Sequence, residues 1–296
     1  AGAVVRRLER ESDNPALASQ FADGAVEAPL TLGNEARLLI DGPQTHAAMF
    51  RAIAAARREI HLETYILGPG EPSERLADLL AAKRKQGVAV RVLYDSVGTL
   101  GTPPEYFERL SADGIATCQF NPVNPLKAEK GWQINNRDHR KLLVVDDSVA
   151  FTGGVNISSV YLAGSFGSKR KVPTRTEGWR DTHIQVKGPV VADFERLFSE
   201  AWARQNCTPA LSGRDKAPAK AGNQAMRVVA ADPQVGKSEF YGMLLAAIGR
   251  AHERVWLTYG YFVPDQQMLD ALKGAARQGV DVRLMLPGFS DFWAVF

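Results

Sequence analysis

The sequence predicts an α/β fold in which helices flank a mixed β-sheet, and three observations support this prediction. Strand-like and helix-like segments alternate along the chain, which is typical of a sheet covered by helices. One helix–strand–helix–strand pattern occurs twice, about 190 residues apart. A short apolar strand also follows a polar motif that contains a histidine and a lysine. With 296 residues and 45% apolar composition, the chain can bury a core of ordinary globular size.

The first elements follow a polar start. Residues 1–30 are rich in alanine and lack periodicity, so we expect a loosely packed leader there. Residues 36–40 predict a short strand, and we expect Asp41-Gly42-Pro43 to close it with a turn. Residues 44–58 then predict a helix, because their apolar residues recur at helical spacing on one face.

Strand and helix patterns continue to alternate downstream. Residues 59–66 alternate between a mostly apolar and a polar set, which predicts a strand with one mostly apolar face and one polar face that carries Glu63. Residues 73–85 predict a helix that ends at Gly87, and residues 88–93 predict a strand. This order favours an α/β sandwich with a mixed sheet.

An internal repeat sets the organisation of the chain. Residues 53–62 resemble residues 248–257, and residues 85–93 resemble residues 277–285. Any two such segments share a general pattern, but these also share Gln-Gly-Val and Val-Arg at matching positions, which favours a duplication.

The repeat predicts four regions. After the leader over residues 1–30 comes a first lobe over residues 31–204. Residues 205–225 are rich in Pro, Gly, Ser, Lys and Ala and predict a linker. Residues 226–296 predict the N-terminal part of a second, truncated lobe.

Charge and cysteine content constrain the function only weakly. A net charge of +3 suits an anionic lipid or a nucleic acid without favouring either. The two cysteines, Cys118 and Cys207, form neither a disulfide framework nor a metal cluster, so we expect two unpaired thiols in or near a core. No apolar run reaches the ~18 residues that span a bilayer. The chain starts at Ala1, which leaves open a signal peptide or anchor outside these residues.

The candidate chemistry is concentrated in residues 135–146, Asn-Asn-Arg-Asp-His-Arg-Lys-Leu-Leu-Val-Val-Asp. His139 and Lys141 are two residues apart where a strand begins, so their side chains share one face. A neutral imidazole can attack phosphorus, and an ammonium group can neutralise the phosphate oxygens. A lone histidine among basic residues is usually a surface residue, but the spacing to Asp146 makes that interpretation weaker here.

A glycine pair and an asparagine follow this strand. Gly153 and Gly154 allow a close approach between the backbone and an anion. The amide of Asn156 can donate hydrogen bonds to the same oxygens. These residues and Lys141 predict a phosphate-binding site.

This His-x-Lys-x4-Asp segment, with small residues and an asparagine after it, resembles the signature of the phospholipase D superfamily. Glu63-Thr64-Tyr65 upstream and Gly-Trp-Arg-Asp-Thr-His at residues 178–183 most resemble the bacterial cardiolipin synthase branch. The similarity extends from Asn34 to Phe296. It implies a two-lobed enzyme with one motif in each lobe, which needs no metal and no cofactor.

The resemblance also implies a mechanism. One histidine attacks phosphorus to form a phosphohistidine, and the other protonates the leaving alcohol and deprotonates the incoming one. Two phosphatidylglycerol molecules would give cardiolipin and glycerol, and water as acceptor would give phosphatidic acid. His139 is then a catalytic histidine, and Lys141 and Asn156 hold phosphate oxygens. Asp146 orders the motif or takes a direct part in the chemistry.

Two further acidic residues are candidates by the same resemblance. Asp181 would orient the catalytic imidazole, with an ordinary ion pair as the alternative. Glu63 would line the site, with a solvated or structural position as the alternative. A basic segment, residues 164–178, would contact anionic headgroups or form a solvated loop.

Residues 226–296, the part of the second lobe in this sequence, contain no His-x-Lys-x4-Asp motif. We expect the chain to be a fragment of a longer enzyme, and the pairing of two chains is the alternative. A cardiolipin-synthase-type phosphatidyltransferase at the bacterial inner membrane, with its membrane face open, is the favoured function. Hydrolysis by a phospholipase D, phosphodiesterase or nuclease, and an inactive fragment that binds anionic lipid, are the alternatives. Nucleic acid is the weaker partner, because no ladder of base-stacking aromatic residues is evident.

Overall fold

The computed structural model describes residues 28–122, 137–162, 179–211, 218–231 and 239–287. The described chain divides into two compact units, Ala28–Val228 and the residues from Val229 on. The predicted leader and the basic segment at residues 164–178 lie outside the described residues, except for the last residues of the leader.

The first unit is built on one mixed sheet. Its elements in chain order are β1 (Thr31–Ile40), α3 (Asp41–Ala55), β2 (Glu59–Thr64), α4 (Glu71–Lys85), β3 (Ala89–Asp95), α5 (Pro104–Ala112), β4 (Ala116–Phe120), β5 (Leu142–Val145), β6 (Val149–Gly153), the 3₁₀ turn η2 (Ser159–Tyr161), β7 (Thr182–Lys187), α6 (Val191–Arg204) and β8 (Gln224–Met226). Within the described residues the strand order is β4-β3-β2-β5-β6-β7-β1-β8. β2, β3 and β4 are parallel, and the remaining neighbours are antiparallel, which confirms the predicted mixed sheet.

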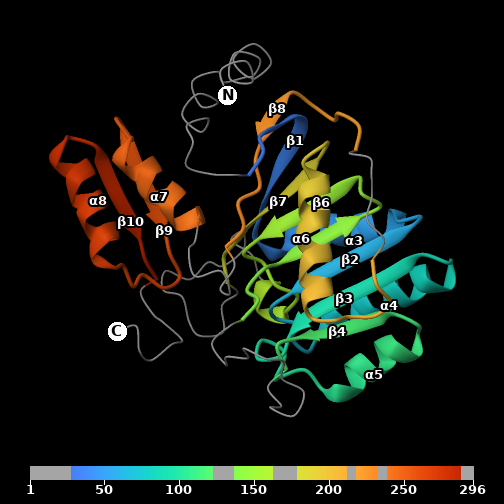
Figure 1. Ribbon diagram of the computed structural model, residues 1–296. Coiled ribbons are helices and arrows are strands. Elements are labelled where there is room, and N and C mark those ends of the chain that lie inside the picture. The colour runs from blue at the N-terminus through green and yellow to red at the C-terminus, as the bar shows by residue number, and fades with distance from the viewer. Residues whose placement is uncertain (1–27, 123–136, 163–178, 212–217, 232–238, 288–296) are drawn as a thin grey trace. The chain divides into compact units, whose positions relative to one another are not determined.

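Helices cover both faces of this sheet. In Figure 1, α6 crosses one face, and α3 and α4 lie on the other. Alternate residues of β5 enter the two apolar cores: Leu143 and Val145 pack in the core with α3 and α4, and Leu142 and Val144 pack in the core with α6. A strand buried on both faces explains why residues 142–145 are a continuous apolar run.

The sheet directions place the histidine motif at one edge. β5 runs antiparallel to β2 and pairs Leu142 with Glu63, near the carboxyl end of β2. β3 is parallel to β2 and ends at Asp95 on the same side. His139 and Lys141, which come just before β5, therefore lie at the edge where β2 and β3 end.

The predicted turn at Asp41-Gly42-Pro43 is wrong, because α3 already begins at Asp41. Pro43 lies in the first turn, where its missing N–H has no partner to lose. The hydroxyl of Thr45 donates a hydrogen bond to the backbone carbonyl of Asp41, the first residue of this helix.

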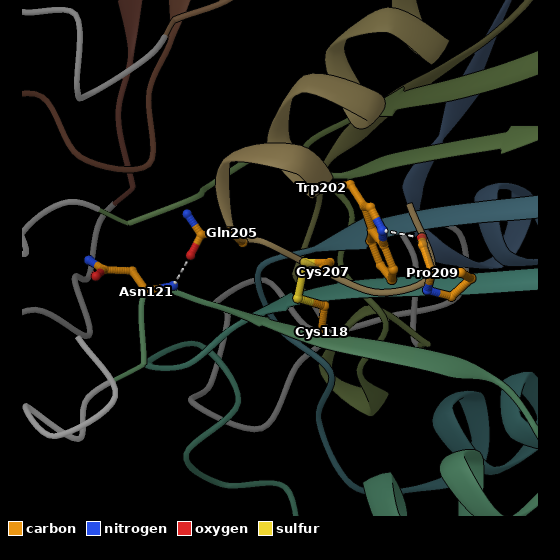
Figure 2. Close-up of a disulfide and its surroundings, with 6 residues drawn as sticks. All are labelled: Cys118, Asn121, Trp202, Gln205, Cys207 and Pro209. Atoms are coloured by element: carbon orange, nitrogen blue, oxygen red, sulfur yellow. Dashed lines mark hydrogen bonds between the residues drawn. A yellow bond between two sulfur atoms is a disulfide. The ribbon is translucent and has the colours of Figure 1, made fainter. Parts of the chain in front are cut away.

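The expectation of two unpaired thiols is also wrong. Cys118 on β4 and Cys207 after α6 form a disulfide with their Cα atoms 5.8 Å apart (Figure 2). They are 89 residues apart in the sequence, and the sheet order brings them together under α6. The segment predicted as a linker, residues 205–225, thus contains one half of a disulfide and most of β8, which pairs with β1.

The second unit repeats part of the first. It contains α7 (Glu239–Gly249), β9 (Arg254–Thr258), α8 (Gln266–Arg277) and β10 (Asp281–Met285). β9 and β10 are parallel and pair Val255 with Val282, in the same register as Ile60 with Val90 in the first unit. Among the described residues, no helix is both long and apolar enough to cross a bilayer.

Candidate active site

Lys141 and His139 meet around the ring of Tyr65. The Lys141 ammonium donates a hydrogen bond of 2.6 Å to the backbone carbonyl of His139 and lies 5.0 Å from the centroid of the Tyr65 ring. The rings of His139 and Tyr65 are 4.5 Å apart and tilted. Lys141 is only 6% exposed, whereas His139 is exposed to solvent. The predicted histidine–lysine pair is therefore preorganised, with an aromatic support that was not among the predicted site residues.

The electrostatics of this pair suit nucleophilic attack on a phosphodiester. Partial burial, and then the charge of Lys141, lower the pKa of His139 to about 4 against the opposing effect of Asp138. Burial lowers the pKa of Lys141 to about 8, although Asp138, Asp181 and Asp95 counteract it. Near pH 7 the imidazole is therefore neutral and nucleophilic, while most of the lysine is charged.

Asp181 lies beside the glycine pair, immediately before β7. Its carboxylate Oδ1 accepts a hydrogen bond from the backbone N–H of Thr182, and a Cβ atom built on Gly154 would lie 1.9 Å from the same oxygen. Burial raises the pKa of Asp181, and Lys141 opposes that rise. Gly154 therefore makes room for a carboxylate that interacts electrostatically with Lys141. In the described residues no hydrogen bond joins Asp181 to the His139 ring, so the orienting role stays a prediction.

His183 is a buried histidine that sequence reasoning did not select. It pairs with Gly153 in the sheet, and a Cβ atom on Gly153 would lie 2.8 Å from its Nδ1. It is 2% exposed, and in the described part of the chain neither ring nitrogen has a hydrogen-bond partner. Burial, and then the charges of His46 and Lys141, lower its pKa to about 3. The signal was present in the sequence, because His183 ends the Gly-Trp-Arg-Asp-Thr-His segment.

Asn156 is buried, two residues after the glycine pair. Its Oδ1 accepts a hydrogen bond from the backbone N–H of Ile66, and its Nδ2 donates one to the hydroxyl of Tyr161. Its backbone carbonyl accepts a hydrogen bond from His46. Asn156 thus ties the segment after β6 to the segment after β2. The contact between Asn156 and phosphate stays a prediction. In that contact the second hydrogen of Nδ2 would be donated to a phosphate oxygen.

Asp146 lies at the opposite end of β5 from Lys141. Five residues of extended chain separate them by roughly 16 Å. The Asp146 carboxylate accepts hydrogen bonds from the backbone N–H groups of Arg57, Arg58 and Glu59, at 2.7, 2.7 and 2.9 Å. These bonds hold the turn between α3 and β2, so the contacts of Asp146 are structural.

Glu63 is buried at the end of β2, next to the residues that flank His139. Its Oε1 is 2.8 Å from Nη2 of Arg140. Burial, and then the neighbouring Asp138, raise the pKa of Glu63 well above its ordinary value. Asp138 in turn accepts hydrogen bonds from the backbone N–H and the Nε of Arg140. This cluster fixes the residues on both sides of His139.

The structure therefore brings together a subset of the predicted site residues, namely His139, Lys141, Asp181, Gly153 and Gly154, while Glu63 contacts Arg140, the residue after His139. It places Asp146 at the far end of β5, where its contacts are structural. Within the described ranges no group of three or more His, Cys, Asp or Glu side chains is placed to hold a metal ion.

Comparison with known proteins is consistent with this geometry. Residues 49–166 and 244–295 match the family described as cardiolipin synthase, phospholipase D-like domain. The chain is 32% identical over 98% of its length to a cardiolipin synthase of Alkalihalophilus pseudofirmus. It is 36% identical over 92% of its length to cardiolipin synthase A of Pseudomonas aeruginosa. It covers 56% and 53% of those two proteins, so it spans about half the length of the curated relatives that it matches.

A solved structure shares the fold. The phosphatidylserine synthase of Haemophilus influenzae aligns with 95% of this chain and 65% of its own, with a TM-score of 0.60 and 12% sequence identity. At this identity the likeness concerns the arrangement of helices and strands alone.

Proposed function

Because this chain belongs to the phospholipase D-like family of cardiolipin synthases, we propose that it forms part of an enzyme that transfers a phosphatidyl group from one alcohol to another. The observation that carries the proposal is the pairing of a neutral imidazole with a buried ammonium group on one backbone segment, at His139 and Lys141. Phosphoryl transfer needs a nucleophile and a cation at adjacent positions, and this pair supplies both.

In the proposed reaction, a ring nitrogen of His139 attacks the phosphorus of phosphatidylglycerol. A P–N bond forms, the bond between phosphorus and the glycerol oxygen breaks, and a second histidine protonates the departing glycerol. The hydroxyl of another phosphatidylglycerol then gives its proton to that second histidine and attacks phosphorus. The products are cardiolipin and glycerol, and His139 is regenerated.

Each nearby group has a role in this scheme. Lys141 neutralises the non-bridging oxygens, which gain charge in the transition state. The backbone at Gly153 and Gly154 and the amide of Asn156 bind the same oxygens. The negative charge of Asp181 offsets the positive charge of Lys141, and its carboxylate orients the imidazole of His139.

The second histidine is proposed to come from a matching motif in a second lobe. We propose that the compact unit Ala28–Val228 is the first lobe and that the residues from Val229 on are part of the second. In the full-length protein the second motif belongs to that second lobe, and the pairing of two chains is the alternative. We propose that the substrate is an anionic phospholipid at a membrane surface and that the enzyme acts at the bacterial inner membrane.

The test uses the full-length protein in detergent with phosphatidylglycerol, and lipid products are identified by mass spectrometry. Cardiolipin and glycerol are expected, and His139→Ala should abolish both. His252→Ala is the matched control, because His252 is exposed in the second unit and has no Lys two residues later. Full turnover by His139→Ala would contradict the proposal. Phosphatidic acid without cardiolipin would support the hydrolytic alternative, and loss of activity with a chelator would contradict the metal-free mechanism.

A further inference from the structure

The Cys118–Cys207 disulfide closes a covalent link between the sheet and the end of α6. Cys118 lies on β4, and Cys207 follows α6 and is buried in the same apolar cluster as Trp202. Figure 2 shows both sulfur atoms directly beneath the end of that helix. The disulfide therefore links β4 to the end of α6 across a sequence separation of 89 residues.

Hydrogen bonds fix the chain on either side of Cys207. The backbone N–H of Cys207 donates to the carbonyl of Trp202, and the Trp202 indole donates to the carbonyl of Pro209 at 3.0 Å. The Gln205 side-chain oxygen accepts a hydrogen bond of 2.9 Å from the backbone N–H of Asn121, three residues after Cys118. The disulfide and the Gln205–Asn121 bond thus clamp the end of β4 at two points (Figure 2).

This clamp connects directly to the segment that carries His139. The carbonyl of Asn121 accepts a hydrogen bond of 3.0 Å from Nη1 of Arg137, two residues before His139. The next residue, Asp138, donates its backbone N–H to a carboxylate oxygen of Asp95 at 3.0 Å. A continuous series of bonds therefore runs from Cys118 through Asn121 and Arg137 to the nucleophile.

We propose that this unit acquires its fold in an oxidising compartment, outside the cytoplasm, and that the Cys118–Cys207 disulfide positions the His139 segment. Cytosolic thiol systems keep cysteines reduced, whereas disulfides persist in the bacterial periplasm. The bond forms by exchange with the disulfide of an oxidoreductase. The two protein thiols are oxidised and lose two protons and two electrons, and the oxidoreductase disulfide is reduced to two thiols. The inference rests on the disulfide and its contacts, so it stands whether or not the proposed transfer reaction is correct.

The compartment is tested in cells that express the full-length protein. Cells are quenched with acid and labelled with a polyethylene-glycol maleimide, and the mass of the protein is read on a gel. No adduct is expected before reduction at these two residues, and two adducts are expected after reduction. Cys118→Ser should give one adduct without reduction, which shows that the reagent reaches Cys207. Two adducts on the wild-type protein without reduction would overturn the compartment assignment.

The positioning role is tested on the purified protein with a readout that does not depend on turnover. Diethyl pyrocarbonate modifies neutral imidazoles, and mass spectrometry gives the ratio of the rates at His139 and at His252. We expect the Cys118→Ser/Cys207→Ser protein to melt about 5–15 °C lower, because the unfolded chain gains freedom, and the rate ratio to change about threefold or more well below that temperature.

Gln205→Ala separates positioning from stability, because it breaks the bond to Asn121 and leaves the disulfide in place. We expect it to change the rate ratio in the same direction as the double serine variant. Glu200→Ala, on the exposed surface of α6, is the matched control and should leave the ratio unchanged. An unchanged ratio in both Gln205→Ala and the double serine variant would overturn the positioning role.

Discussion

The ammonium of Lys141 is anchored by a 2.6 Å hydrogen bond to the backbone carbonyl of His139, so the cation is held by the residue whose reaction it would assist. The bond spans only two residues, and the ring of Tyr65 supports both side chains. A phosphate oxygen that approaches Lys141 is therefore brought close to the imidazole without a large rearrangement of the protein. Preorganisation of this kind is worth more inside a protein than in water.

Replacing this cation should reduce the rate of transfer far more than it reduces stability. Lys141→Met keeps the length of the side chain and removes the charge, and we expect kcat to fall by about 10²–10³-fold. The measurement is the initial rate of cardiolipin formation by the full-length protein. Lys187→Met, at the exposed end of β7, should keep the wild-type rate. Unchanged kcat in Lys141→Met would remove the lysine from the mechanism.

The rate should depend on pH with two limbs. Partial burial lowers the pKa of His139 to about 4, so the nucleophile becomes active as the pH rises through that value. Burial lowers the pKa of Lys141 to about 8, so the cation loses its charge as the pH rises further. We expect kcat/KM to rise as His139 loses its proton near pH 4 and to fall as Lys141 loses its proton near pH 8. In Lys141→Arg, any residual activity should lose the alkaline limb, because a guanidinium stays charged. An alkaline limb that persists in this variant would assign it to another group.

The fold and the pairing of His139 with Lys141 were predictable because their signals are local. The strand at residues 142–145 is a run of four apolar residues, and the repeat of residues 85–93 at 277–285 preserves a glycine that adopts a φ of +87° at both positions. The spacing of His139 and Lys141 also lies within one short segment. Such signals survive in the sequence because neighbouring residues encode them.

Contacts between distant segments were not predictable in the same way. Nothing near Cys118 indicates that β4 ends beside Cys207, since their meeting depends on the strand order of the whole sheet. His183 lies next to Gly153 only because β6 and β7 pair in one register. The hydrogen-bond partners of Asp146 also escaped prediction, because Arg57, Arg58 and Glu59 lie almost 90 residues earlier in the sequence.

Asp146 offers a test that separates structural from catalytic acidic residues. Asp146→Ala removes the acceptor of three backbone hydrogen bonds, and we expect the free energy of unfolding to fall by about 2 kcal/mol. At temperatures where the variant remains folded, kcat should stay within about threefold of wild type, because the carboxylate is one strand length from the site. Denaturant unfolding and the initial rate give the two quantities.

Asp147→Ala is the matched control for this variant. Asp146 and Asp147 have left-handed φ values of 52° and 50°, so an alanine meets similar backbone strain at both positions. Asp147 pairs with Arg58 at 3.3 Å, and we expect its loss to cost about 1 kcal/mol or less beyond that shared strain. A loss of kcat by several orders of magnitude in Asp146→Ala alone, in a folded protein, would restore a direct catalytic role to Asp146.

We predict that position 154 requires glycine, because the Asp181 carboxylate occupies the space where a side chain of residue 154 would lie. A methyl group at Gly154 would lie 1.9 Å from Asp181 Oδ1, so Gly154→Ala must displace the carboxylate or the backbone. We expect kcat to fall about tenfold or more, because a shift of about 1 Å in a positioning group is costly.

Gly101→Ala is the control: its Cβ atom meets nothing within 4 Å, and we expect stability and kcat close to wild type. A double-mutant cycle with Asp181→Ala identifies the cause, because the two losses should be less than additive if Gly154 acts through Asp181. Additive losses would show that the glycine affects the site by another route, such as the backbone of β6.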